Sequence, residues 1–96
     1  MDAEQFNRVS RALADPRRTE ILERIAHSKE LACSTLLSEC VVSQPTVSHH
    51  LKELLVAGLI KPRREAKFYY YSLDRKAWSE YLAELRRRIP TGRRKV

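Results

Sequence analysis

Glycine, proline and cysteine are scarce in this sequence, and long apolar runs are absent. Two Gly and four Pro among 96 residues exclude collagen-like and low-complexity chains. No apolar run approaches the roughly 20 residues that a membrane-spanning helix needs, so we expect no membrane partner. The N-terminus carries Asp2 and Glu4 without the apolar segment of a secretory signal, which predicts a cytoplasmic protein.

The two cysteines, Cys33 and Cys40, cannot make a disulfide framework. If both lie on one helix, seven residues correspond to about 10.5 Å of rise, whereas a disulfide needs Cα atoms within about 7 Å. Both also belong to an apolar stripe with Leu36 and Leu37. We therefore interpret them as buried, inert thiols in a reducing compartment. A thiol sensor and a metal site remain open as alternatives.

Positive charge is abundant and unevenly distributed. The formal net charge is +7, from 19 Lys and Arg against 12 Asp and Glu. Residues 1–48 hold 6 basic and 7 acidic side chains, whereas residues 49–96 hold 13 basic and 5 acidic ones. A basic half beside a nearly neutral half indicates one face for a polyanion such as DNA. The alternative is a charged surface that serves only solubility.

Apolar spacing and capping residues predict five helices and one β-hairpin. The length allows a single core, with one domain over residues 1–90 and a basic tail over 91–96. The boundaries follow from residues that favour helix ends, namely Asp15, Ser43, Gly58, Asp74 and Pro90. The expected helices cover 2–14, 16–27, 33–40, 44–57 and 75–89, and the strands cover 59–61 and 68–73. This mostly α order (helix, helix, helix, helix, strand, strand, helix) predicts a winged helix-turn-helix with a hairpin wing.

The fourth predicted helix carries small polar side chains in its first turns. With Val47 and Leu51 turned inward, Gln44, Thr46 and Ser48 lie on other faces, and these residue types hydrogen-bond to base edges. We interpret the segment as a recognition helix and the charged hairpin loop as a wing that contacts phosphates or the minor groove. A solvated helix face and a solvated loop are the alternatives. The predicted DNA-binding residues are Ser43, Gln44, Thr46, Ser48, His49, Lys52, Arg63, Arg64 and Lys67.

Two apolar stripes lie on the first and last predicted helices. A chain this short has little interior with which to bury both, so we predict a two-fold homodimer that joins them. The predicted dimer-interface residues are Phe6, Val9, Leu13, Trp78, Tyr81, Leu82, Leu85 and Ile89.

The histidines do not predict a metal site. His49 and His50 are adjacent, and neighbouring positions on a helix point about 100° apart. We expect His50 to pack with a hydrogen bond and His27 to cap a helix end. On the second strand, Tyr69 and Tyr71 share a face and are expected to pack. Since only scattered Ser and His are available for catalysis, we expect neither an enzyme nor a cofactor.

Three motifs resemble the ArsR-type (SmtB/ArsR) family of bacterial repressors. They are ALADPRRTEIL at 12–22, SQPTVSHHLKEL at 43–54 with AGLI at 57–60, and FYYYSL at 68–73. The likeness covers about residues 10–80. It implies a small winged-helix homodimer that represses its promoter at a palindromic operator and releases DNA when an effector binds. It also implies a dimer interface made by the first and last helices.

The chain departs from this family where an effector would bind. The well-known members carry a Cys-Val-Cys motif, and the matching positions here are Ala32, Cys33 and Ser34. Other members use Asp and His of the last helix for zinc, but residues 75–89 contain no His or Cys. We therefore expect a small organic ligand near the dimer interface, or a partner protein, as the effector. A thiol-based redox-sensing repressor, and a winged-helix protein-interaction module without specific DNA binding, are the alternative functions.

Overall fold

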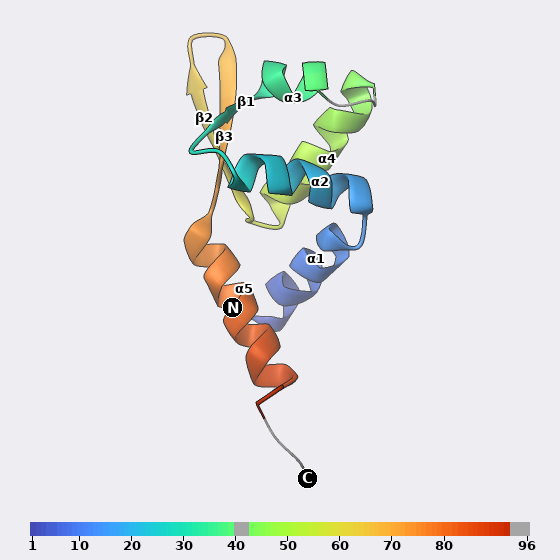
Figure 1. Cartoon of the computed structure of the whole chain (residues 1–96), viewed down its shortest axis with the longest axis vertical. Helices are drawn as coiled ribbons and strands as arrows, with labels where there is room; N and C mark the ends of the chain where they lie inside the picture. Colours follow the sequence, from blue (N-terminus) through green and yellow to red (C-terminus); the bar gives the residue numbers. More distant parts are fainter. Residues whose placement is uncertain (40–42, 93–96) are drawn as a thin grey trace.

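The structure, a computed structural model, describes residues 1–39 and 43–92. Within these ranges five helices pack together, with a small antiparallel sheet at their margin (Figure 1). The elements are α1 (Ala3–Leu13), α2 (Pro16–Ala26), β1 (Leu31–Ala32), α3 (Cys33–Glu39), α4 (Gln44–Val56), β2 (Ile60–Glu65), β3 (Phe68–Leu73) and α5 (Arg75–Arg88). The predicted winged helix-turn-helix class is confirmed. No helix of the described ranges has the length and apolar character to cross a bilayer.

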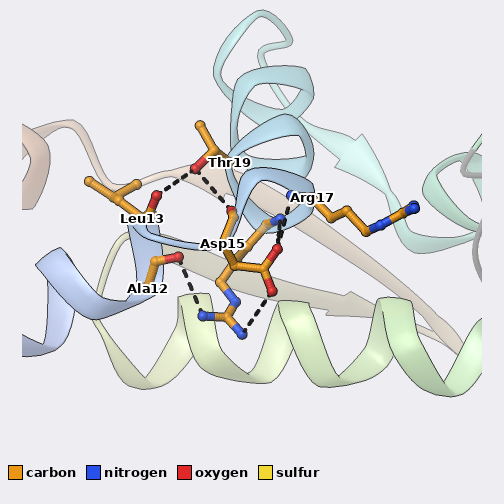
Figure 2. A network of polar contacts seen from close by, with 6 residues as sticks. Ala12, Leu13, Asp15, Arg17 and Thr19 are labelled. Atoms are coloured by element: carbon orange, nitrogen blue, oxygen red, sulfur yellow. Dashed lines mark hydrogen bonds and ion pairs between the residues drawn. The ribbon is translucent and has the colours of Figure 1, made fainter.

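Aspartate side chains begin three of the helices. The carboxylate of Asp2 accepts a hydrogen bond from the backbone N–H of Gln5 at 2.8 Å, and that of Asp74 accepts one from Ala77 at 3.0 Å. Asp15 accepts from the N–H of Arg17 at 2.9 Å, as Figure 2 shows. Each bond satisfies an amide that has no partner within its helix, which is worth about 1 kcal/mol.

Ser43 precedes α4 with the extended backbone of an N-cap, but its side chain does not cap the helix. Its hydroxyl instead lies 3.0 Å from the hydroxyl oxygen of Thr46. The predicted start of α4 is therefore confirmed, while the capping bond expected of Ser43 is replaced by a bond between two side chains.

The sheet contains a strand that the sequence did not predict. Its order is β1-β3-β2, and the two residues of β1 pair with Tyr71 and Tyr70 of β3. β2 is also longer than expected and includes Pro62, which lies opposite Tyr71. Because β2 is an edge strand, a proline without an N–H is tolerated in it. The predicted six-residue loop is thus a two-residue turn at Ala66 and Lys67, and Ala66 has a φ of +55°.

One apolar core joins α1, α2, α4 and the base of the hairpin. Val9, Ile25, Leu36, Val47 and Leu54 are all fully buried within it. The molecule measures 54 × 25 × 24 Å. In Figure 1 the hairpin projects from one end, while α5 descends beside α1 toward the other.

The packing expected of the strand tyrosines is only half correct. Tyr71 and Leu73 are buried against the core, but Tyr69 on the same face is 45% exposed. The reason is that the hairpin extends beyond the body. Tyr69 therefore points to the same side as Tyr71, but no part of the core covers it. Tyr69 lies instead under the guanidinium of Arg64, which is 5.4 Å from its ring centre.

Candidate nucleic-acid interface

α4 is held by one apolar face and leaves its polar face exposed. Val47, Leu51 and Leu54 are buried, and α4 packs mainly on α2. The side chains of Gln44, Ser48 and Lys52 are exposed at four-residue spacing, which places them along one stripe of the helix. Ser43 and His49 are exposed beside that stripe, whereas Thr46 is half-buried. The structure therefore brings together the residues predicted on this helix as one accessible surface.

The wing carries its three predicted cations in different surroundings. Arg64 donates through Nε to the carbonyl of Ala66 at 3.0 Å, and Lys67 lies 6.0 Å from the ring centre of Phe68. All three side chains are largely exposed. Both the wing tip and the start of α4 lie at the end of the molecule opposite the last turn of α5 (Figure 1).

Arg63 is already occupied by two carboxylates. Its Nε and Nη2 donate to the two oxygens of Glu30 at 2.7 and 2.8 Å, and its Nη1 donates to Glu65 at 2.6 Å. The guanidinium also lies 4.6 Å from the ring centre of Tyr70. Hydrogen bonding to Arg63 lowers the pKa of Glu30, so the pair stays charged over a wide pH range. Glu30 was missed because it lies 33 positions away in the sequence and carries no local signal.

His50 is buried beside α2, and one expectation about it is wrong. Its side chain is 5% exposed, yet its Nδ1 has no hydrogen-bond partner among the described residues. Burial lowers the pKa of His50, because the charged ring would lose hydration. His27 does cap the end of α2, as predicted, with Nδ1 2.8 Å from the carbonyl oxygen of Glu23.

Cys33 is the first residue of α3 and is half-buried against the core. Burial raises the pKa of its thiol, which disfavours the reactive thiolate. Ala32 lies in β1, and Ser34 is exposed in the first turn of α3. Cys40 falls outside the described residues. Across the described ranges, no three His, Cys, Asp or Glu side chains gather as a metal site would require.

The residues of the two apolar stripes differ widely in how deeply they are buried within one chain. Val9 is fully buried, and Phe6 and Tyr81 are nearly so, with ring centres 5.2 Å apart. Ile89 is 67% exposed and Leu82 is 38% exposed. The remaining members, Leu13, Trp78 and Leu85, are half-buried. The expectation that one chain cannot bury these stripes is therefore wrong for the inner residues of both helices.

The basic end of α5 is partly neutralised by Glu84. This carboxylate pairs with Arg87 and Arg88, and these hydrogen bonds lower the pKa of Glu84 to about 2. Arg88 also lies 4.0 Å from the ring centre of Phe6. Arg88 is therefore part of the α1–α5 contact, whereas Arg86 and Arg87 are exposed.

Comparisons with known proteins agree with this architecture. A helix-turn-helix domain family matches residues 13–63. The arsenical resistance operon repressor of Staphylococcus xylosus is 34% identical over 74 residues, which cover 77% of this chain and 70% of that protein. An ArsR-like transcriptional regulator from Rhodococcus sp. RHA1 superposes with a TM-score of 0.80 at 24% identity, covering 88% of this chain and 78% of that one.

A second similar structure is that of a homodimer. It is a winged helix-turn-helix DNA-binding domain from Mycobacterium bovis. Its TM-score is 0.69 at 26% identity, and the match covers 96% of this chain and 89% of that domain. Together with the three motifs and the observed fold, these matches show that the chain belongs to the ArsR-type (SmtB/ArsR) family of winged helix-turn-helix transcriptional regulators.

Proposed function

We propose that the protein is a homodimeric, sequence-specific DNA-binding repressor. The first turns of α4 enter the major groove, and the wing contacts the flanking backbone. The observation that carries the proposal is the exposed stripe of Gln44, Ser48 and Lys52 on a helix whose other face is buried. A helix N-terminus with small polar side chains suits both base edges and a nearby phosphate.

A second copy of the chain completes the DNA-binding unit. The exposed apolar side chains of α5, Leu82 and Ile89, supply the contact, with Leu13, Trp78 and Leu85 at its margin. Phe6, Val9 and Tyr81 support this face from beneath. The homodimeric domain from Mycobacterium bovis supports the same assembly here. Two-fold symmetry then requires a palindromic operator with half-sites about 34–36 Å apart.

Selection from a random pool of DNA duplexes tests the function, because this experiment does not require a known operator. The parent protein is expected to enrich a palindromic sequence, and Gln44→Ala and Ser48→Ala are expected to lose or change that enrichment. Lys76→Ala, an exposed cation at the start of α5, is the control and should enrich the same sequence as the parent. If the parent enriches no sequence, a protein-interaction module replaces the proposed function.

The effector of this repressor is not a soft metal. The positions that match the Cys-Val-Cys motif are Ala32, Cys33 and Ser34, so two thiolates cannot converge there. We expect the effector to be a small organic ligand that binds near the dimer interface, or a partner protein. Arsenite, cadmium and zinc should leave the affinity for DNA unchanged under reducing conditions.

A titration of the DNA complex with each metal checks this. Dissociation at stoichiometric metal that disappears in Cys33→Ser would contradict the proposal. Release of DNA by an oxidant, lost in the same variant, would instead indicate a thiol-based redox sensor.

A further inference from the structure

Arg63 connects the two outer strands of the sheet across the central one. Ala32 of β1 and Arg63 of β2 both pair with Tyr70 of β3, from opposite sides. Glu30 precedes β1, and its carboxylate reaches across this row to the guanidinium of Arg63. The contact therefore ties the segment after α2 to the hairpin at the point where the hairpin leaves the body.

The hydrogen bonds of Arg63 have the geometry of a strong pair. Two parallel N–H groups meet both oxygens of Glu30, which is the bidentate arrangement that a guanidinium favours. A third N–H meets Glu65 from within the wing, and the ring of Tyr70 lies against the guanidinium. These contacts restrict the guanidinium, and they join β2 to the segment that precedes β1.

The same surroundings make Arg63 a poor phosphate ligand. A phosphate would have to displace a bidentate carboxylate and then remain beside Glu30 and Glu65. Together Arg63, Glu30 and Glu65 carry a formal charge of −1, so this cluster offers a phosphate no net positive charge. Arg64 and Lys67 are one and four residues further along the hairpin, and among the described residues neither forms an ion pair.

We propose that Arg63 is a positioning residue, which together with Glu30 sets the direction of the wing, while Arg64 and Lys67 contact the DNA backbone. This inference rests on the proposed function only for the DNA contacts. An exposed ion pair contributes little to overall stability, so the variants below are expected to fold. The effect of breaking the pair is a loss of wing orientation.

Glu30→Gln separates the two roles by the sign of its effect on affinity. If Arg63 positions the wing, loss of the carboxylate weakens binding to the selected operator by about twofold or more, the lower end of couplings between neighbouring residues. If Arg63 binds phosphate, the same change removes a competitor and tightens binding. Glu20→Gln, an equal change of charge at an exposed site on α2, is the control and should not weaken binding.

Salt dependence supplies a second, independent measurement. Arg64→Ala is expected to reduce the slope of log affinity against log salt by about one, as for one lost phosphate contact. Arg63→Ala is expected to weaken binding without that change in slope. The double variant Glu30→Gln/Arg63→Ala should be no weaker than Arg63→Ala alone, because both changes break one contact. A slope reduced by about one in Arg63→Ala overturns the proposal.

Hydrogen exchange tests the contact without any DNA. Backbone amides of β2 and β3 should exchange faster in Glu30→Gln than in the parent, while those of α4 should not change. Unchanged exchange in the hairpin overturns the positioning role even if the protein binds DNA normally. Conversely, if the parent binds no DNA, the proposed function fails, and faster exchange in the hairpin still supports the Glu30–Arg63 contact.

Discussion

The recognition helix and the wing are attached to the same body by different forces. α4 is held by fully buried apolar side chains such as Val47 and Leu54. In β2 only Ile60 is buried, and the remaining five residues are exposed. Beyond the buried Tyr71 and Leu73 at the base of β3, strand pairing and exposed ion pairs therefore hold the wing. Apolar packing is not weakened by salt, whereas exposed ion pairs are screened. Salt should therefore leave the attachment of α4, the proposed base-reading helix, unchanged and weaken part of the attachment of the wing.

The largest expected effect comes from removing an anchor of α4. Leu54→Ala should lower the free energy of unfolding by about 2–5 kcal/mol, because Leu54 is fully buried and its removal leaves a cavity. Chemical denaturation measures this. Val56→Ala is the matched control on the same helix, since Val56 is 49% exposed, and it should change stability by no more than about 0.5 kcal/mol. Equal losses in both variants would show that packing does not hold α4 in place.

Gln44→Ala should weaken binding to the selected operator by about 1–3 kcal/mol while sparing binding to random DNA. The reason is that an exposed Gln in the first turn can contact a base edge, and its loss removes a contact that only the correct sequence offers. Titration of both duplexes at one salt concentration measures the two affinities. Equal binding of operator by parent and variant would remove Gln44 from the reading surface.

A pH dependence is expected from the buried histidine of α4. The pKa of His50 is lowered by burial, so the native state favours the neutral ring. Asp15 opposes this shift, while Arg17, Arg18 and His49 reinforce it. Since the unfolded chain binds the proton more readily, stability is full above about pH 6.5 and falls as the pH drops below it. Denaturation midpoints between about pH 5 and 8 measure the effect.

Replacement of the ring tests this dependence. His50→Gln removes the titrating group and keeps a polar side chain at the same position, so it should flatten the pH profile of stability. A profile as steep as that of the parent would show that another group is responsible.

The smallest expected effect lies in the turn of the wing. Ala66 has a φ of +55°, a conformation that a Cβ disfavours and glycine adopts freely. Ala66→Gly is therefore expected to raise the free energy of unfolding by up to about 1 kcal/mol. Denaturation of parent and variant under identical conditions checks this, and a loss of stability would show that the turn relaxes around Ala66 without strain.

The sequence predicted α4 well and the wing poorly, for a physical reason. Regular apolar spacing with Pro45 and Gly58 near its ends defines a helix locally, and the structure places α4 within one residue of the expected span. β1 has only two residues, too few to show any period. β2 contains Pro62 and four charged residues, so it lacks the alternation of apolar and polar residues that indicates a strand.

Long-range contacts explain what else could not be predicted. Glu30 and Arg63 meet only after the sheet has formed, and Phe6 and Tyr81 meet only when α5 returns to α1. The candidate reading surface was accessible from the sequence because all its residues lie on one helix. The difference between the contacts of Arg63 and those of Arg64 and Lys67 could not be predicted, because all three residues belong to one run of charged positions in the sequence.

Pro62 has a consequence for how copies of this protein can meet. β2 is the open edge of the sheet, and an edge strand with free N–H groups invites pairing with a strand of another molecule. Pro62 removes one such donor, and the charged residues Arg63, Arg64 and Glu65 follow it directly. The opposite edge, β1, offers only two residues. Edge-to-edge aggregation is thereby disfavoured, so the wing can remain extended without a partner strand.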